Sequence, residues 1–172
     1  MLGYAALSLL GASLYQRAAA RTLDGRIHAE VQNKNRDFRT AIREGDVLGR
    51  LAIPRIGLSV MILQGTSSQT LHLGVGHIDG TALPGESGHI GIAGHRDTYF
   101  RSLKGIQRND EIQIQTESGT AKYVVDWLQI TAPGDVDILS PPEESAVTLV
   151  TCYPFRYVGS APERFVVHAH KL

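Results

Sequence analysis

The residues best suited to covalent chemistry in this 172-residue chain are Cys152, His95 and Arg164. Cys152 is the only cysteine, so it cannot form an intrachain disulfide, and the dipeptide Tyr-Pro follows it. Proline cannot continue a central strand, so the thiol is expected at the end of a strand. A thiol becomes an effective nucleophile when a neighbour takes its proton or stabilises the thiolate. The other two residues are candidates for that neighbourhood.

His95 has the most suggestive setting of the seven histidines. It follows the segment HIGIAG, so that Gly94 precedes it and the polar residues Arg96-Asp97 come next, as at the mouth of a loop. A glycine before the histidine allows close approach of a neighbouring backbone. Arg164 lies twelve residues after Cys152, beyond a Gly-Ser-Ala-Pro turn, so a hairpin can return it to the thiol. Its permanently charged fork of N–H donors is suited to a developing oxyanion.

Each of these residues also has a purely structural interpretation. Free cysteine is among the most buried residue types, which makes Cys152 a candidate core residue. Arg164 can pair with Glu163 or lie in solvent. His168 and His170 are two residues apart on the last expected strand, so they share a face and are typical of cross-strand or solvent-facing polar residues.

A metal site built from His77, His89 and His95 is disfavoured. Their spacings of twelve and six residues match no compact zinc motif. The acidic residues do not gather at the spacing of a calcium loop. We therefore expect neither a metal nor another cofactor.

The elements that position these residues are expected to be short strands. From Asp46 onward, β-branched runs alternate with Gly, Pro and Asn. This pattern favours an all-β barrel or sandwich over a helix bundle or a Rossmann fold. Single helical turns are expected at 67–71 and 100–103. The expected strands are 47–53, 58–63, 89–93, 110–116, 122–130, 146–151 and 164–171.

Together these motifs resemble the sortase family of cysteine transpeptidases. Thr148–Cys152 reads TLVTC and matches the family's TLxTC motif. Gly94-His95 matches the surroundings of the family's catalytic histidine, 57 residues before the cysteine, and Arg164 matches its catalytic arginine. The resemblance spans about residues 46–172 and includes LAIPRIGL, GTALPGESGHIGIAGHRDTYF and TCYPFRYVGSAPERFVVHA. It implies a mainly β fold, the sortase-type eight-stranded β-barrel with short helices, preceded by an N-terminal helical segment.

The resemblance also implies a mechanism. Cys152 would attack the carbonyl of the Thr in an LPxTG-like C-terminal sorting signal and form a thioacyl-enzyme. Arg164 would stabilise the oxyanion, and His95 would protonate the departing amine and deprotonate the incoming one. Thr151, beside the nucleophile, is expected to contact the substrate. The implied partners are proteins bearing such a signal and an amine acceptor, either a cell-wall precursor or a protein amine.

Within the family, the GHRD and TCYPF segments are most similar to class D sortases, with features of classes E and C. Pilin-building class C enzymes usually carry an Asp-Pro-aromatic motif, and residues 16–50 contain none. Two other functions stay open. One is a thiol peptidase that acts mainly as a hydrolase. The other is a non-enzymatic extracytoplasmic β-barrel binding module with an incidental cysteine.

The distribution of charge separates an N-terminal part from the body. The chain has 17 basic and 17 acidic residues, but residues 1–45 carry a net charge of +3 and residues 46–172 carry −3. Overall neutrality argues against nucleic acid as a partner, because a phosphate backbone selects a basic surface. A hydrophobic content of 42% is too high for a disordered chain.

The uncharged run Leu2–Tyr15 is shorter than the roughly 20 residues that cross a bilayer. A signal peptide needs positive charge before its apolar run, whereas the first arginine here follows it. We expect residues 1–15 to be a truncated transmembrane or signal-anchor segment, with a signal sequence or a packed helix as alternatives. Residues 16–45 are expected to form a helical membrane-proximal stalk, and 46–172 the catalytic barrel. The resemblance then implies a single-pass protein of the cell membrane with its catalytic domain outside the cytoplasm.

Overall fold

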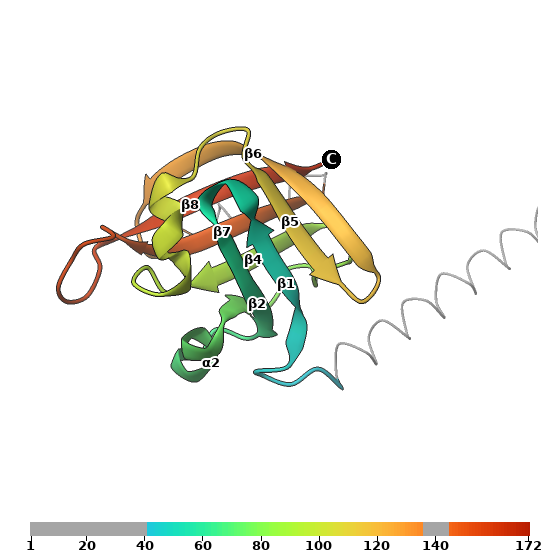
Figure 1. Cartoon of the computed structure of the whole chain (residues 1–172). Helices are drawn as coiled ribbons and strands as arrows, with labels where there is room; N and C mark the ends of the chain where they lie inside the picture. Colours follow the sequence, from blue (N-terminus) through green and yellow to red (C-terminus); the bar gives the residue numbers. More distant parts are fainter. Residues whose placement is uncertain (1–40, 136–144) are drawn as a thin grey trace, which may run out of the picture. The chain divides into compact units, whose positions relative to one another are not determined.

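The computed structural model describes residues 41–135 and 145–172 (Figure 1). The chain divides into two compact units, Met1–Ile42 and Arg43–Leu172. The predicted membrane segment 1–15 lies outside the described residues, and so does nearly all of the predicted stalk 16–45. No helix in the described part of the chain is long and apolar enough to cross a membrane.

Eight strands of the second unit close into a barrel (Figure 1). Their order around the barrel is β1-β2-β3-β4-β7-β8-β6-β5. Closure removes the free strand edges that an open sheet would expose. The sequence prediction of an eight-stranded β-barrel is therefore confirmed. The strands are β1 (Val47–Ile53), β2 (Leu58–Gln64), β3 (Val75–His77), β4 (His89–Gly94), β5 (Glu111–Thr116), β6 (Gly119–Thr131), β7 (Ala146–Tyr153) and β8 (Glu163–Lys171).

Three short helices complete the described fold, namely η1 (Pro54–Ile56), α2 (Ser68–Leu73) and η2 (Tyr99–Gly105). The last two lie where the sequence predicted helical turns. Ser67 caps α2, because its hydroxyl accepts a hydrogen bond from the Thr70 N–H at 3.2 Å and satisfies a donor that the helix leaves unpaired.

Strand β3 was not predicted. It has only three residues around a glycine, which is too short for any alternation of apolar and polar residues. A Cβ atom on Gly76 would lie 2.2 Å from the Gly65 carbonyl oxygen, so this close approach requires glycine. Strand β3 is parallel to β2 and antiparallel to β4. Its start, just after α2, therefore lies beside the end of β4.

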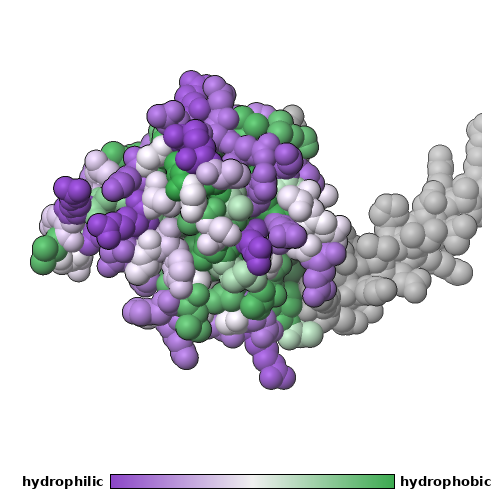
Figure 2. Space-filling model, viewed as in Figure 1, coloured by the Kyte–Doolittle hydropathy of each residue, from purple (hydrophilic) through white to green (hydrophobic). Residues whose placement is uncertain are grey.

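The barrel interior is a continuous apolar core, and alternation along each strand decides which side chains enter it. On β4 these are Ile90 and Ile92, and on β7 they are Val147 and Leu149, all completely buried. The visible face carries both hydrophilic residues and patches of hydrophobic residues (Figure 2). The exposed apolar side chains include Val47 on β1 and Met61 on β2.

An ion pair ties η1 to the start of β5. Arg55 donates to both carboxylate oxygens of Asp110, from Nε to one and from Nη2 to the other, the second at 2.6 Å. The same carboxylate accepts the Gln107 N–H at 2.8 Å, and the Asp110 side chain is only 5% exposed. The hydrogen bond from Arg55 holds the pKa of Asp110 below its usual value, and the bond from Gln107 acts in the same direction against the cost of burial.

Candidate active site

The register of two parallel strands places His95 beside Cys152. In the pairing of β4 with β7, Gly94 lies opposite Thr151, so the next residue of each strand follows side by side. Neighbouring strands lie about 4.8 Å apart. Because the residues flanking the core positions alternate outward, both His95 and Cys152 belong to the outer face of the barrel. Cys152 is half-buried and forms no disulfide.

The next strand brings Arg164 to the same place. Strands β7 and β8 are antiparallel, and Cys152 is the direct partner of Arg164 in their register. Side chains of directly opposed residues lie on one face, with Cβ atoms about 4.5–5.5 Å apart. The hairpin suggested by the twelve-residue spacing therefore exists. The three residues singled out from the sequence meet on the outer face, where three adjacent strands end or begin.

The guanidinium of Arg164 is held by the backbone just before it. Its Nη1 donates to the Glu163 carbonyl oxygen at 2.9 Å and to the Ala161 carbonyl oxygen at 3.3 Å. The expected structural alternative, an ion pair with the Glu163 carboxylate, is not the contact made, because the acceptor on that residue is its carbonyl. A guanidinium has five N–H donors, so these bonds occupy only part of it.

Thr151 fastens the two parallel strands together at the site. Its hydroxyl donates to the Gly94 carbonyl oxygen at 2.7 Å, and the residue is only 2% exposed. The bond joins the residue before His95 to the residue before Cys152. A contact between Thr151 and substrate stays a prediction, and its hydroxyl is engaged within the fold.

Gly94 is required by a packed ring rather than by a neighbouring backbone. A Cβ atom at this position would lie 2.6 Å from Cδ2 of Phe100, which is completely buried. The Phe100 N–H also donates to the His95 carbonyl oxygen at 3.0 Å, at the start of η2. The chain thus turns tightly after His95 and packs back beneath it, which fixes the position of the histidine backbone.

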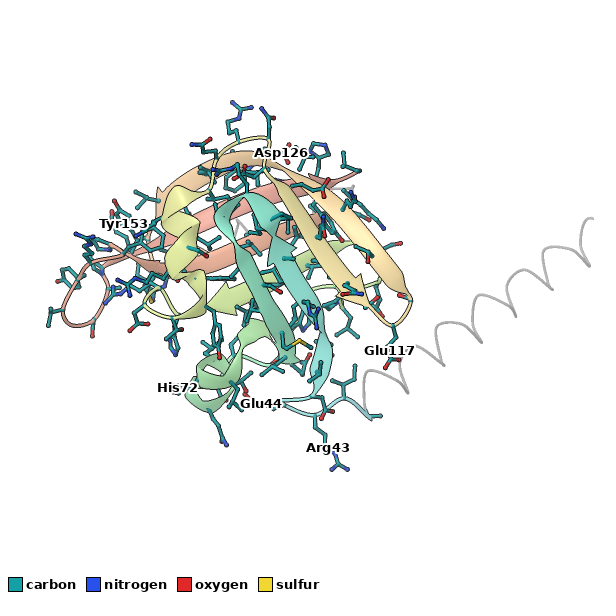
Figure 3. All side chains as sticks on the ribbon, in the orientation of Figure 1. Arg43, Glu44, His72, Glu117, Asp126 and Tyr153 are labelled. Carbon is teal, nitrogen blue, oxygen red and sulfur yellow. The ribbon has the colours of Figure 1, made fainter. Side chains whose placement is uncertain are left out.

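A second histidine, His72 on α2, lies against His95. The two ring centroids are 5.3 Å apart, and the planes meet edge to face at 84°. His72 Nδ1 lies 2.6 Å from the Ser68 carbonyl oxygen, and the Tyr99 hydroxyl donates to the Leu73 carbonyl oxygen at 3.0 Å. These bonds fasten the end of α2, labelled by His72 in Figure 3, beside the site. Sequence reasoning missed this contact, because it depends on the pairing of the unpredicted strand β3 with β4.

The remaining histidines named in the sequence analysis lie apart from this cluster or serve other contacts. His77 is buried in β3, with Nδ1 3.0 Å from Gln64 Oε1. His89 Nε2 lies 2.6 Å from the Thr148 hydroxyl oxygen. His168 and His170 both bond Asp126 of β6, with Nδ1 atoms 3.1 and 2.6 Å from its two carboxylate oxygens. Figure 3 shows Asp126 well away from Tyr153, the residue after Cys152.

Comparison with protein families supports the resemblance seen in the motifs. The family model described as the Sortase domain matches residues 51–172. Sortase D of Bacillus subtilis (strain 168) is 34% identical over 129 residues, covering 74% of this chain and 65% of that protein. Sortase SrtE1 of Streptomyces coelicolor is 35% identical over 129 residues, covering 64% of this chain and 37% of that protein. The chain thus spans less than two thirds of the length of these curated relatives.

Solved structures of sortases also share the fold. A Clostridium perfringens Sortase D5 transpeptidase superposes with a TM-score of 0.70 at 30% sequence identity, covering 82% of this chain and 88% of that one. Sortase C from Clostridium perfringens SM101 superposes with a TM-score of 0.68 at 32% identity, covering 76% of this chain and 72% of that one.

Proposed function

The chain belongs to the sortase family, and from this premise we propose that it is a cysteine transpeptidase. Its substrate would be a protein with an LPxTG-like C-terminal sorting signal. The observation that carries the proposal is the meeting of His95, Cys152 and Arg164 on the outer face of three adjacent strands. A nucleophile, an acid–base group and a fixed cation side by side are the groups that acyl transfer requires.

The first half of the reaction is acylation. The Cys152 thiolate attacks the carbonyl carbon of the signal's threonine, and the electron pair of the C=O bond moves to oxygen. Arg164, beside the sulfur in the register, stabilises this oxyanion with the N–H donors that its backbone contacts leave over. When the tetrahedral intermediate collapses, the C–N bond breaks and His95 gives its proton to the departing amine. The products are a thioester on Cys152 and the released C-terminal fragment.

The second half is transfer. An incoming amine loses a proton to His95 and attacks the thioester carbonyl, and collapse returns the thiolate of Cys152 and leaves a new amide. We propose that Thr151 contributes to substrate contact through its backbone, since its hydroxyl already donates to the Gly94 carbonyl oxygen. The acceptor would be an amine of a cell-wall precursor or of another protein.

We also propose that the chain is attached to the cell membrane as a single-pass protein, with residues 46–172 outside the cytoplasm. The uncharged run Leu2–Tyr15 supports the attachment to a membrane, whereas the arginines that follow it would by themselves favour the cytoplasmic side. The placement outside the cytoplasm therefore rests on the proposed reaction. In the proposed reaction the protein that carries the signal is transferred to an amine of the cell envelope, outside the membrane, so the catalytic domain has to be on that side.

The proposal is tested with a synthetic peptide that contains an LPxTG-like signal, incubated with and without an added amine such as triglycine. We expect cleavage after the threonine in both cases and a new amide-linked product, identified by mass spectrometry, when the amine is present. A product that is always the free acid would favour the hydrolase. Cleavage of equal rate in the Cys152→Ala variant would overturn the cysteine mechanism.

A further inference from the structure

Arg96, the residue after His95, reaches across to the loop that joins β7 to β8. Its Nη2 donates to the Tyr157 carbonyl oxygen at 3.0 Å and to the Gly159 carbonyl oxygen at 3.2 Å. The guanidinium carbon also lies 5.7 Å from the centroid of the Tyr157 ring, within the range of a cation–π contact. One side chain thus makes three contacts with two loop residues.

Phe155 packs the first part of this loop against the core, and the residues that follow it are exposed. Val158 at its tip is fully exposed, and the Tyr157 residue is 49% exposed. Figure 1 shows the loop extending away from the barrel as the red hairpin beyond β7 and β8. Because residues 156–160 are exposed, the local stability of this outer part of the loop depends on polar contacts, and Arg96 supplies two of them.

The same loop ends at the residues that hold Arg164. The Arg164 guanidinium donates to the carbonyl oxygens of Ala161 and Glu163, two and four residues beyond the Arg96 contact at Gly159. A displacement of the loop would therefore move the acceptors of Arg164. Arg96 is joined covalently to His95 on one side and through the loop to Arg164 on the other.

Arg96 keeps one buried nitrogen, Nη1, without a hydrogen-bond partner among the described residues, which indicates that its contacts with the β7–β8 loop hold the side chain in place. An unpaired buried donor is unfavourable, and such groups gather where function constrains a fold. Lysine has no second terminal nitrogen and no planar group to place over the Tyr157 ring, so the geometry selects arginine.

We propose that Arg96 is a positioning residue that sets the β7–β8 loop, residues 154–162, and through it the guanidinium of Arg164 relative to His95 and Cys152. The proposal rests on the function proposed above and adds a residue that acts through another. Arg96 should therefore contribute to kcat only in a chain that retains Arg164.

The test measures peptide cleavage and hydrogen exchange in the full chain with Arg96→Ala, Arg96→Lys and the matched control Arg101→Ala, an exposed arginine of η2. We expect Arg96→Ala to lower kcat about 10- to 100-fold, the order of loss that misplaced catalytic groups produce. Arg96→Lys should fall between wild type and Arg96→Ala, and Arg101→Ala should match wild type. Exchange in residues 154–162 should accelerate in Arg96→Ala and not in the control.

A double-mutant cycle separates positioning from general weakening of the fold. In an Arg164→Lys background, adding Arg96→Ala should change kcat by less than about twofold, because the two residues act as one unit. Equal losses in both backgrounds, or unchanged exchange of the loop in Arg96→Ala, would overturn the proposal. If wild type cleaves no sorting peptide, the proposed function fails, whereas the exchange measurement still decides whether Arg96 holds the loop.

Discussion

The inner and outer faces of β4, β7 and β8 are built from the same strands but differ in chemistry. The inner face is mainly aliphatic, with side chains such as Ile92, Leu149 and Val167 that are completely buried. The outer face of the same strands carries His95, Cys152 and Arg164 at one end. Further along β8 it carries His168, which bonds Asp126 of β6. Strand alternation thus separates the residues that stabilise the barrel from those proposed to perform chemistry on it.

Buried polar atoms without a hydrogen-bond partner, which lower stability, lie close to the site. Three buried side-chain polar atoms in the described residues have no hydrogen-bond partner, namely His95 Nε2, Arg96 Nη1 and Ser102 Oγ. All belong to the segment that follows β4. By contrast, Asp110, eight residues after Ser102, is satisfied by Arg55 and the Gln107 N–H. Buried polar atoms without partners lower the stability of a fold, and they are expected near functional sites. The Arg55–Asp110 ion pair, in which the buried carboxylate is satisfied, lies outside the site.

The largest expected effect on activity distinguishes two histidines of the outer face. His95→Ala should lower kcat for the peptide by about 10²–10⁴-fold, the usual contribution of an acid–base group. His168→Ala should change kcat by less than about threefold, because the contacts that it removes are with Asp126, Trp127 and His89 and not with the proposed catalytic residues. Steady-state kinetics of the two variants provides the measurement, and a larger loss of kcat in His168→Ala would show that His95 is not the acid–base group.

A slightly smaller loss is expected when Arg164 is replaced by lysine. The variant keeps the charge and loses the fork of N–H donors, so kcat should fall about 10²-fold, as when one oxyanion donor is removed. KM should change little, since the oxyanion exists only in the transition state and intermediate. A rate close to that of wild type would show that Arg164 is a surface residue rather than part of the site.

A substitution on the inner face should lower stability and leave activity nearly unchanged. Leu149→Ala should lower the free energy of unfolding by about 2–5 kcal/mol, because it leaves a cavity in the barrel core. At temperatures where the variant is folded, kcat should stay within a few-fold of wild type. Chemical denaturation measures the first quantity and peptide cleavage the second. The neighbouring Val150→Ala, on the outer face and half-buried, is the control and should cost clearly less stability.

The smallest expected effect is a change in melting temperature when the ion pair between Arg55 and Asp110 is broken. Because the folded-state pKa of Asp110 is lowered, its contribution to stability is present above the unfolded pKa of about 3.9 and is lost as pH falls through the lower folded value. Asp110→Asn should therefore melt a few degrees below wild type at pH 7. The difference should shrink as the pH is lowered below about 4. A difference independent of pH would mean that the charge of Asp110 contributes nothing.

Much of the barrel could be predicted because its strands are long enough to show their pattern. The expected strand 47–53 matches β1, and 146–151 falls within β7. Strand β3 could not be predicted, because three residues carry no periodicity and its identity depends on pairing with β2 and β4. The contact between His72 and His95 follows from that pairing, so it was hidden from the sequence as well.

At the site, the residue types and their order along the chain predicted which side chains would gather, but not what each one touches. The motif ending in Cys152 and the turn before Arg164 were sufficient to expect a hairpin. The hydrogen bond from the Thr151 hydroxyl to the Gly94 carbonyl oxygen could not be predicted, because it depends on the register of β4 against β7. The reach of Arg96 to the β7–β8 loop depends on the loop's conformation, which no local pattern specifies.

The most direct test of the central claim is labelling with a peptide electrophile, such as a chloromethyl ketone of Leu-Pro-Ala-Thr, followed by the intact mass. We expect one adduct per chain, on Cys152, with a rate that saturates as the electrophile concentration rises and that falls in Arg164→Lys. A chloromethyl ketone can also alkylate a histidine, so the Cys152→Ala variant is the control, and it should take up no label. A chain that takes up no peptide label, and whose Cys152 is also inert to iodoacetamide, would contradict the account and favour a binding module with an incidental cysteine.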